Sequence, residues 1–389
     1  MYYFWFMIQR LAYQKILKMA QKFPVLVFTG PRQSGKTTLS KLVFSDYRYV
    51  SMENPDMLYF AQTDPKGFLE TYDDKVIIDE AQNAPELFSY IQQIVDESGK
   101  TGQYILSGSQ NFLMLEKVTQ SLAGRVYILE LLPLSHAEIK TVKQLNIFES
   151  IIQGGYPRTF DKEIAPNDFY PSYIQTYIER DVRSMVNVHD LSTFRKFINI
   201  CAHHVGQIFN ANTISKDLGI DIKTVQRWLS ILETSYIAFT LKPWHKNFSK
   251  RIVKSPKLYF YDTGLVCYLL GIEDEKELII SNYKGAIFEN YALVDIIKNH
   301  KNNGEIKNYY FWRDSNGNEI DLIIERGLKI QCIEMKASQT VKSEYIKSLH
   351  YIDSFDKTLQ FKHYLLNTQD FSETRSNEMI VSWNNTIEI

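Results

Sequence analysis

The 389-residue sequence has few cysteines, no long apolar run and almost no net charge. Its three cysteines, Cys201, Cys267 and Cys332, lie far apart, which excludes a disulfide framework or a thiol zinc motif and indicates a reducing cytoplasm. No stretch reaches the roughly 18 apolar residues of a membrane helix, so we expect no membrane partner. The formal charge of −1 excludes attraction of the whole chain to nucleic acid, so any such surface must be local.

Apolar and aromatic residues are abundant instead. Hydrophobic residues make up 44% of the chain and charged residues 23%, which is typical of a globular protein. The 25 tyrosines and 23 phenylalanines supply enough apolar bulk for several cores. A chain of this length predicts about two or three domains.

A glycine-rich stretch between an apolar strand and an amphipathic helix predicts a phosphate-binding loop. Residues 30–37, GPRQSGKT, match the pattern G-x-x-x-x-G-K-[ST], and the strand VLVF precedes them. Its glycines let backbone N–H groups turn toward phosphate oxygens at a helix N-terminus. We expect Lys36 to reach the β- and γ-phosphates of ATP and Thr37 to ligate Mg²⁺. The predicted nucleotide-binding residues are Gly30, Pro31, Arg32, Gln33, Ser34, Gly35, Lys36, Thr37 and Thr38.

Two acids follow a second apolar strand, at the position where α/β sheets bind ligands. Asp79 and Glu80 come directly after the apolar residues 76–78. We expect Asp79 to hold Mg²⁺ through water. Glu80 is then placed to orient or deprotonate the water that attacks the γ-phosphate.

Two further positions near the nucleotide have open interpretations. Ser107, Ser109 and Gln110 follow a third strand, and one of them could sense the γ-phosphate; the alternative is turn chemistry. Arg125 precedes a fourth strand and could neutralise transition-state charge, within its own chain or across a contact in a homo-oligomer. The alternative for Arg125 is an ordinary surface arginine.

The middle of the chain predicts a helix, a tight turn and a second helix within residues 211–244. Asn212 or Thr213 can cap the first helix, Gly219 can close the turn, and Asp221 can cap the second helix. This order is typical of a winged helix-turn-helix.

Cations in this region suggest a contact with nucleic acid. Lys223, Gln226 and Arg227 face outward on the second helix and could enter a major groove. Residues 242–257 contain no acid and fit phosphate contacts. Their six cations are Lys242, Lys246, Lys250, Arg251, Lys254 and Lys257. A solvated surface or a protein-docking surface is the alternative.

Three acids and a lysine near the C-terminus predict a second metal site. Glu289 falls on the apolar stripe of a helix, where a buried acid needs a partner or a metal. A hairpin with strands 320–325 and 329–336 brings Asp321 within about two residues of Glu334. Lys336 points to the same side as Glu334. These groups suit Mg²⁺ binding and phosphodiester cleavage, and the alternative is a hairpin with surface charges.

Together these motifs resemble a family of prokaryotic ATPases that join an AAA-type P-loop domain to a C-terminal domain of unknown function (number 4143). That domain is related to the PD-(D/E)XK nucleases. The matching stretches include LVFTGPRQSGKTTL, VIIDEAQ, YILSGSQNFLM, GAIFENY and NEIDLIIE. The resemblance implies that ATP and Mg²⁺ bind at Lys36, Thr37 and Asp79, with Glu80 catalytic. It places in the nuclease metal-site positions Asp321, Glu334 and Lys336.

We therefore expect an α/β protein of three parts: an AAA-type P-loop ATPase domain at 1–145, a helical and winged-helix segment at 146–270, and a PD-(D/E)XK nuclease-like domain at 271–389. We expect an Mg²⁺-dependent ATPase that acts on nucleic acid, and we expect DNA rather than RNA. The alternative is a nucleotide-controlled switch or scaffold that binds protein partners without nuclease activity.

Overall fold

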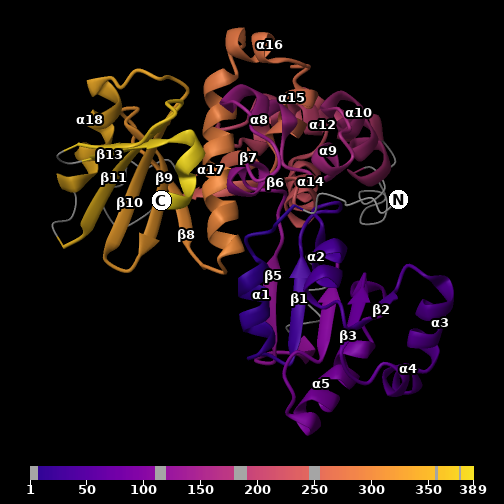
Figure 1. Ribbon diagram of the computed structural model, residues 1–389. Helices are drawn as coiled ribbons and strands as arrows, with labels where there is room; N and C mark the ends of the chain where they lie inside the picture. Colours follow the sequence, from indigo (N-terminus) through magenta and orange to yellow (C-terminus); the bar gives the residue numbers. More distant parts are fainter. Residues whose placement is uncertain (1–7, 110–119, 179–190, 245–254, 355–357, 376–377) are drawn as a thin grey trace.

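The computed structural model describes residues 8–109, 120–178, 191–244, 255–354, 358–375 and 378–389. It is an α/β structure with a five-stranded sheet and an eight-stranded sheet (Figure 1). The long helix α17 (Lys284–Asn302) stands between the larger sheet and the other helices (Figure 1). Within these described ranges, no helix is both long enough and apolar enough to cross a bilayer.

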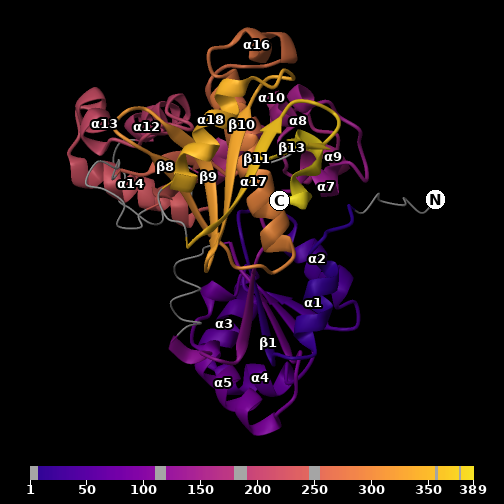
Figure 2. The ribbon, with the colours of Figure 1, turned by 90° about the vertical axis from the view of Figure 1, so that its left-hand side faces the viewer.

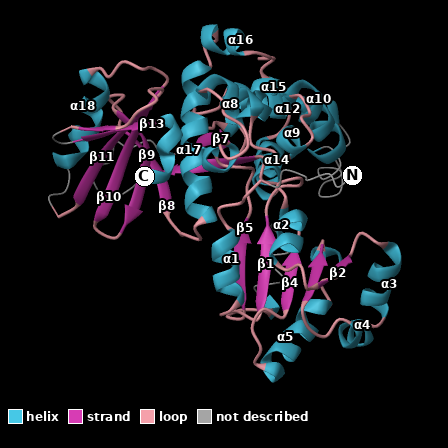
Figure 3. Ribbon diagram, viewed as in Figure 1, coloured by secondary structure: helices cyan, strands magenta, loops and turns pink. Residues whose placement is uncertain are grey.

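The smaller sheet is entirely parallel, in the order β2-β3-β4-β1-β5. Its strands are β1 (Val25–Thr29), β2 (Arg48–Ser51), β3 (Val76–Asp79), β4 (Tyr104–Ser107) and β5 (Val126–Glu130). Its helices are α1 (Tyr13–Ala20), α2 (Lys36–Val43), α3 (Pro55–Thr63), α4 (Pro65–Thr71), η1 (Ala81–Asn83) and α5 (Leu87–Ser98). Alternate residues of β1 pack into two different cores, as expected of a parallel strand covered on both faces. Figure 3 shows all these strands pointing toward the rest of the molecule, so the residues that follow them meet at that edge.

Short helices make up most of the middle of the chain. They are α7 (His136–Ile139), α8 (Ile147–Gln153), α9 (Arg158–Asp161), α10 (Pro166–Tyr173), the π-helix η2 (Ile174–Ile178), α12 (Leu191–His203), α13 (Ala211–Leu218), α14 (Ile222–Thr234), α15 (Thr263–Leu269) and α16 (Glu275–Ile280). Their buried side chains join those of α17 and of the larger sheet in one continuous core. The middle and the C-terminal part are therefore packed as one body.

The predicted helix-turn-helix is present as α13 and α14. Gly219 adopts a left-handed φ of 66° after α13, and Asp221 caps α14, so both predictions are confirmed. The predicted cap of α13 is wrong: Asn210 is the cap, and its side chain accepts the backbone N–H groups of Asn212 and Thr213. Those two residues already lie within the helix, so their backbone N–H groups receive the cap and do not provide it.

The larger sheet has the order β12-β13-β11-β10-β9-β8-β6-β7. Its strands are β6 (Ala238–Pro243), β7 (Lys257–Phe260), β8 (Asn308–Arg313), β9 (Glu319–Arg326), β10 (Lys329–Lys336), β11 (Gln360–Asn367), β12 (Glu373–Thr374) and β13 (Glu378–Ser382). The remaining helices are α18 (Ser343–Tyr351), η3 (Ile352–Ser354) and η4 (Trp383–Glu388). The predicted hairpin is confirmed as β9 and β10, which pair antiparallel. Figure 2 shows this sheet above the smaller one, with α17 alongside it.

The two strands after α14 do not stand apart as a wing. They pair with each other, and β6 also pairs in parallel with β8, where Lys242 lies opposite Tyr310. These strands therefore form the far end of the larger sheet. The residue pattern of this region did not predict that arrangement, because the partner strand lies about 70 residues away along the sequence.

Candidate functional site

The glycine-rich loop follows β1 and leads into the N-terminus of α2. Gly30 has a φ of 140°, and a Cβ atom there would lie 2.2 Å from the carbonyl oxygen of Leu131. Gly35 has a φ of 94° and precedes the first helical residue, Lys36. Both glycines are therefore required by the backbone, and the loop turns its peptide groups around the start of α2.

Lys36 is buried inside this loop. Its Nζ donates to the carbonyl oxygens of Gly30 at 2.9 Å and Pro31 at 2.7 Å. Burial lowers the pKa of Lys36 to about 8, and the charges of Glu80 and Asp79 oppose that shift. The ammonium group is thus held by neutral carbonyl oxygens. The charged oxygens of a bound polyphosphate would form stronger, charge-assisted hydrogen bonds with it.

Asp79 is the centre of a group of oxygen atoms beside the loop. Its Oδ2 accepts hydrogen bonds from Thr37 Oγ1 at 2.9 Å and from the Tyr49 hydroxyl at 2.8 Å. Its Oδ1 accepts from Ser107 Oγ, which is buried. Burial, and then the charge of Asp79, raises the pKa of Tyr49, so its phenol stays protonated as a donor. Carboxylate and hydroxyl oxygens are ligands that Mg²⁺ prefers, so this donor set fits the predicted ion.

Glu80 lies next to this group in a left-handed backbone conformation, with a φ of 52°. Its Oε2 accepts a hydrogen bond from Ser109 Oγ at 3.1 Å and another from Gln82 Nε2. A left-handed conformation is uncommon for a non-glycine residue and carries some backbone strain. Of the three predicted sensors, Ser107 contacts Asp79, Ser109 contacts Glu80, and Gln110 lies outside the described residues.

Arg125 lies at the opposite edge of the smaller sheet. Its carbonyl oxygen accepts the N–H of Val25, the first residue of β1, and its guanidinium pairs with Asp96 at 2.8 Å. A role for Arg125 at the phosphates of its own chain does not fit this position. The physical reason is strand direction: residues that precede parallel strands gather at the edge away from the nucleotide loop. A role across a subunit contact stays a prediction.

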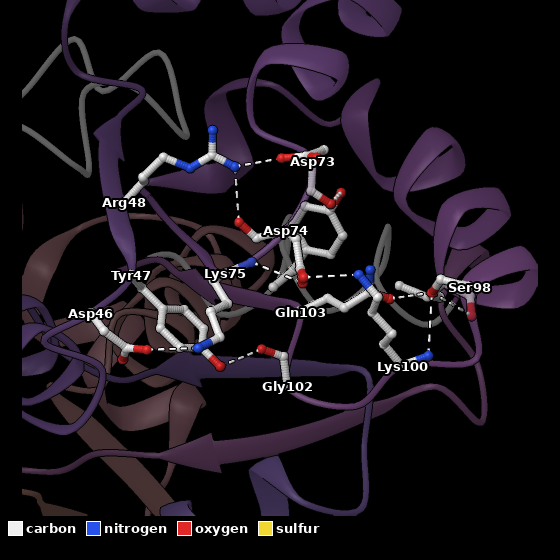
Figure 4. Close-up of polar contacts among 12 residues, drawn as sticks. Asp46, Tyr47, Arg48, Asp73, Asp74, Lys75, Ser98, Lys100, Gly102 and Gln103 are labelled. Atoms are coloured by element: carbon white, nitrogen blue, oxygen red, sulfur yellow. Dashed lines mark hydrogen bonds and ion pairs between the residues drawn. The ribbon is translucent and has the colours of Figure 1, made fainter.

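Figure 4 shows part of this opposite edge, where ion pairs join the loops that precede β2, β3 and β4. The pairs are Arg48–Asp73 at 2.6 Å, Lys75–Asp46 at 2.8 Å and Lys100–Asp74 at 3.0 Å. Each pair is largely exposed to solvent, so each adds little to stability. The side chains drawn there are paired with one another, and the glycine-rich loop lies at the other edge of the sheet.

Arg10 also contacts the loop, although no motif in the sequence marks it. Its buried guanidinium donates to the carbonyl oxygens of Ser34 at 2.7 Å and Leu132 at 2.9 Å, and to Glu138 Oε1 at 2.9 Å. The Glu138 side chain is fully buried and also caps α7. One arginine therefore links the nucleotide loop to the start of the middle region.

The predicted C-terminal site residues come together on α17, β9 and β10. Lys336 Nζ lies 2.5 Å from Glu334 Oε1 and 3.6 Å from Asp321 Oδ2. Asp321 Oδ2 also accepts the N–H of Met335 at 2.7 Å. The other oxygen of Glu334, Oε2, is buried and has no hydrogen-bond partner among the described residues. We call Glu289, Asp321, Glu334 and Lys336 the acidic cluster.

Charge is crowded in the acidic cluster. Burial and then the charge of Asp321 raise the pKa of Glu334 to about 8 and that of Glu289 to about 7. Burial lowers the pKa of Lys336, but the three carboxylates raise it further, so its pKa lies above the ordinary value. A divalent cation would stabilise the ionised forms of these carboxylates, and the unpartnered oxygen of Glu334 offers it a ligand.

The prediction that Lys257 belongs to a phosphate-binding surface is wrong. It is buried, and its Nζ pairs with Glu289 Oε1 at 3.0 Å and with Glu319. Burial lowers its pKa, but the surrounding groups, including Glu289, raise it well above the ordinary value. Lys257 therefore faces the acidic cluster and is not available to a phosphate backbone, because it is buried and already paired with two carboxylates.

The rest of the predicted nucleic-acid surface is divided between described and undescribed residues. Lys223, Gln226 and Arg227 are exposed on α14, as predicted, and Lys242 is exposed on β6. The remaining four cations of the run lie outside the described residues: Lys246, Lys250, Arg251 and Lys254.

Comparisons with known proteins find family models along most of the chain. The family model described as "AAA domain" matches residues 22–140. Two models of domains of unknown function, DUF8612 and DUF4143, match residues 144–276 and 284–385. Among solved structures, a Walker-type ATPase of Pyrococcus abyssi is 13% identical, over 67% of this chain and 94% of its own, with a TM-score of 0.41. A RuvB protein of Thermotoga maritima is 15% identical, over 60% of this chain and 89% of its own, with a TM-score of 0.31.

Two curated relatives are similar over most of their length. An uncharacterized protein of Mycobacterium tuberculosis is 31% identical over 337 residues, which are 85% of this chain and 74% of that protein. An uncharacterized protein of Mycobacterium bovis matches with the same identity and coverage. The chain therefore belongs to the family of these mycobacterial proteins and carries an AAA-type ATPase domain, followed by the domains of unknown function DUF8612 and DUF4143.

Proposed function

We propose that this chain is an Mg²⁺-dependent ATPase whose nucleotide cycle controls phosphodiester cleavage of nucleic acid at the acidic cluster. The observation that carries the ATPase is the contact between Thr37 and Asp79, 2.9 Å long, beside the buried ammonium of Lys36. The next residue, Glu80, supplies the base.

Each residue of the nucleotide site has a distinct part. Mg²⁺ bound by Thr37 and Asp79 would neutralise charge between the β- and γ-phosphates. Lys36 exchanges its two carbonyl contacts for phosphate oxygens and holds the γ-phosphate in position. Glu80 orients the attacking water and accepts its proton, and Ser109 fixes the carboxylate that does so.

Steady-state ATP hydrolysis tests this half of the proposal. Glu80→Gln keeps the shape of the side chain and removes the base, so turnover should fall about 100-fold or more while nucleotide still binds. Lys36→Ala should lose binding as well. Lys18→Ala, an exposed lysine on α1, is the matched control and should behave as wild type. Unchanged turnover in Glu80→Gln would refute the assignment of the base.

The acidic cluster is proposed as the site of phosphodiester cleavage. Asp321 and Glu334 would hold a divalent cation that polarises the scissile phosphate. Lys336 lies against both carboxylates, where its charge can stabilise the negative charge that develops on the phosphate. The exposed polar face of α14, with Lys223 and Arg227, is the proposed contact with the nucleic acid backbone.

Cleavage of labelled single-stranded and double-stranded DNA and RNA, with Mg²⁺ or Mn²⁺, tests this second half. We expect cleavage by the wild type and none by Asp321→Ala. Glu344→Ala removes an exposed acid of the same domain and should leave cleavage unchanged. Cleavage that persists in Asp321→Ala, or that never appears in the wild type, would remove the nuclease and leave the ATPase standing.

Helix α17 supports a coupling between the two sites. Its N-terminal half carries Glu289 of the acidic cluster. Its C-terminal half contacts the chain just after β5: Asp295 Oδ1 accepts the N–H of His136 at 2.7 Å, and Lys298 Nζ donates to the carbonyl oxygen of Leu134 at 3.1 Å. A shift of that segment during the nucleotide cycle would therefore move a helix that lines the acidic cluster.

A second candidate is a nucleotide-controlled switch for a protein partner, without cleavage. The burial of Lys257 favours it, because that lysine and Lys336 already offset part of the negative charge of the acidic cluster. The switch predicts partner binding that Lys36→Ala abolishes. It also predicts ATP turnover that neither DNA nor RNA stimulates, whereas the nuclease proposal predicts stimulation.

A further inference from the structure

A second group of metal-ligating side chains lies in the C-terminal domain, apart from the acidic cluster. His350 lies in the last turn of α18, Asp353 lies in η3, and His363 lies in β11. One donor atom from each of the three falls within 4.8 Å of the others. Among the described residues this is the one group of three histidine, cysteine or acidic side chains gathered so closely. His363 pairs with Cys332, two residues before Glu334 on β10, so the group uses none of the residues of the acidic cluster.

The distances within the group suit one shared ion. Asp353 Oδ2 lies 3.0 Å from His363 Nε2 and 3.4 Å from His350 Nδ1. Ligands bound to zinc at about 2.1 Å in a tetrahedral arrangement stand about 3.4 Å apart. The ring centroids of the two histidines are 4.6 Å apart, so small rotations of the side chains bring both nitrogens within reach of one ion.

The surroundings of the group also suit an ion. Glu378 Oε2 lies 3.5 Å from Nε2 of His350, the nitrogen that faces away from Asp353. A carboxylate in that position takes the ring N–H and leaves Nδ1 free to bind a metal. Asp353 Oδ1 lies 2.9 Å from His363 Nε2, so both oxygens of this carboxylate face the group.

We propose that His350, Asp353 and His363 bind one Zn²⁺ ion, through His350 Nδ1, His363 Nε2 and the Asp353 carboxylate. Two imidazoles and one carboxylate favour Zn²⁺ over Mg²⁺, which prefers oxygen ligands only. The Asp353 side chain is 41% exposed, so water from the surface can fill the fourth position. The ion fastens α18 and η3 to β11, and therefore to the strand beside β10, which carries Glu334 and Lys336.

Zinc titration of the full chain tests the proposal. Protein stripped with a chelator is titrated with Zn²⁺ in competition with a chromophoric chelator, and then with Co²⁺, whose visible absorption reports tetrahedral coordination. We expect one equivalent of Zn²⁺ to bind and to raise the Tm. His350→Gln and Asp353→Asn should each weaken binding at least about tenfold and remove the rise in Tm.

The controls separate this site from other ligands of the chain. His203→Gln removes an exposed histidine of α12 and should bind Zn²⁺ as the wild type does. Glu344→Ala removes an exposed acid of α18 and should also leave the affinity unchanged. His350 and Asp353 are both partly exposed, and circular dichroism of the metal-free variants checks that at least one of them folds. Absence of zinc binding by the wild type, or equal affinity in the wild type and in a folded His350 or Asp353 variant, would overturn the proposal and leave a hydrogen-bonded His–Asp–His group.

Discussion

Replacement of Arg10 by methionine should weaken both the fold and the nucleotide site. Methionine keeps most of the apolar stem but removes the three hydrogen bonds to Ser34, Leu132 and Glu138. The carboxylate of Glu138 then stays buried with its cationic partner removed. Breaking a buried pair in this way costs about 3–5 kcal/mol. We therefore expect the free energy of unfolding to fall by about that amount, and the affinity for ATP to fall because the carbonyl group of Ser34 loses the donor that positions it.

Urea unfolding measures the first effect, in the cooperative transition that includes the ATPase domain. Arg125→Met is the matched control, because it removes an arginine that pairs with an acid at the exposed edge of the same sheet. The free energy of unfolding should fall much less in this variant than in Arg10→Met. A double-mutant cycle with Glu138→Gln isolates the pairwise energy, which should be large because the two side chains are buried together. A loss in Arg10→Met no greater than that in Arg125→Met would refute the idea that the buried pair joins the loop to the middle region.

Three further predictions concern single side chains. Burial lowers the pKa of His300 to about 4, so between pH 4 and 6.5 the unfolded chain binds a proton that the folded chain does not. The stability that the neutral His300 contributes is therefore present above pH 6.5 and is lost as the pH falls toward 4. Urea unfolding of His300→Gln should show a weaker pH dependence than that of the wild type. Tyr236→Phe removes a hydrogen bond of 3.0 Å to Thr29 Oγ1 and should lower the free energy of unfolding by about 1 kcal/mol, whereas no measurable loss would contradict that bond. Gly30→Ala places a Cβ atom 2.2 Å from Leu131 O, so ATP binding measured by calorimetry should be lost, and wild-type affinity would contradict the loop geometry.

The nucleotide site could be predicted from the sequence because its parts follow strand ends. Lys36 and Thr37 begin α2, one short loop after β1, and Asp79 and Glu80 end β3 or follow it. In a parallel sheet those ends meet at one edge, so local patterns alone place the residues together. The hairpin of Asp321 and Glu334 was predictable for a similar reason, because a short turn sets the register of two neighbouring strands.

Contacts between distant segments could not be predicted in this way. Tyr49 reaches Asp79 from a neighbouring strand, and no motif marks it. Arg10 has no distinguishing neighbours in the sequence, yet it joins three separated segments. Lys257 belonged to a run of cations without acids, so it resembled a surface lysine, but α17 and β9 supply its acidic partners. In each case the partner depends on how whole elements pack, which composition and spacing do not encode.

The pairing of β6 with β8 limits how this protein can be divided. A fragment that begins at residue 271 would lack β6, so the backbone of β8 would lose its neighbour, including the bond of 2.7 Å from Trp244 N–H to the carbonyl oxygen of Phe311. An uncovered strand edge of this kind promotes aggregation. A stable fragment of the C-terminal sheet must therefore begin no later than residue 238, where β6 starts.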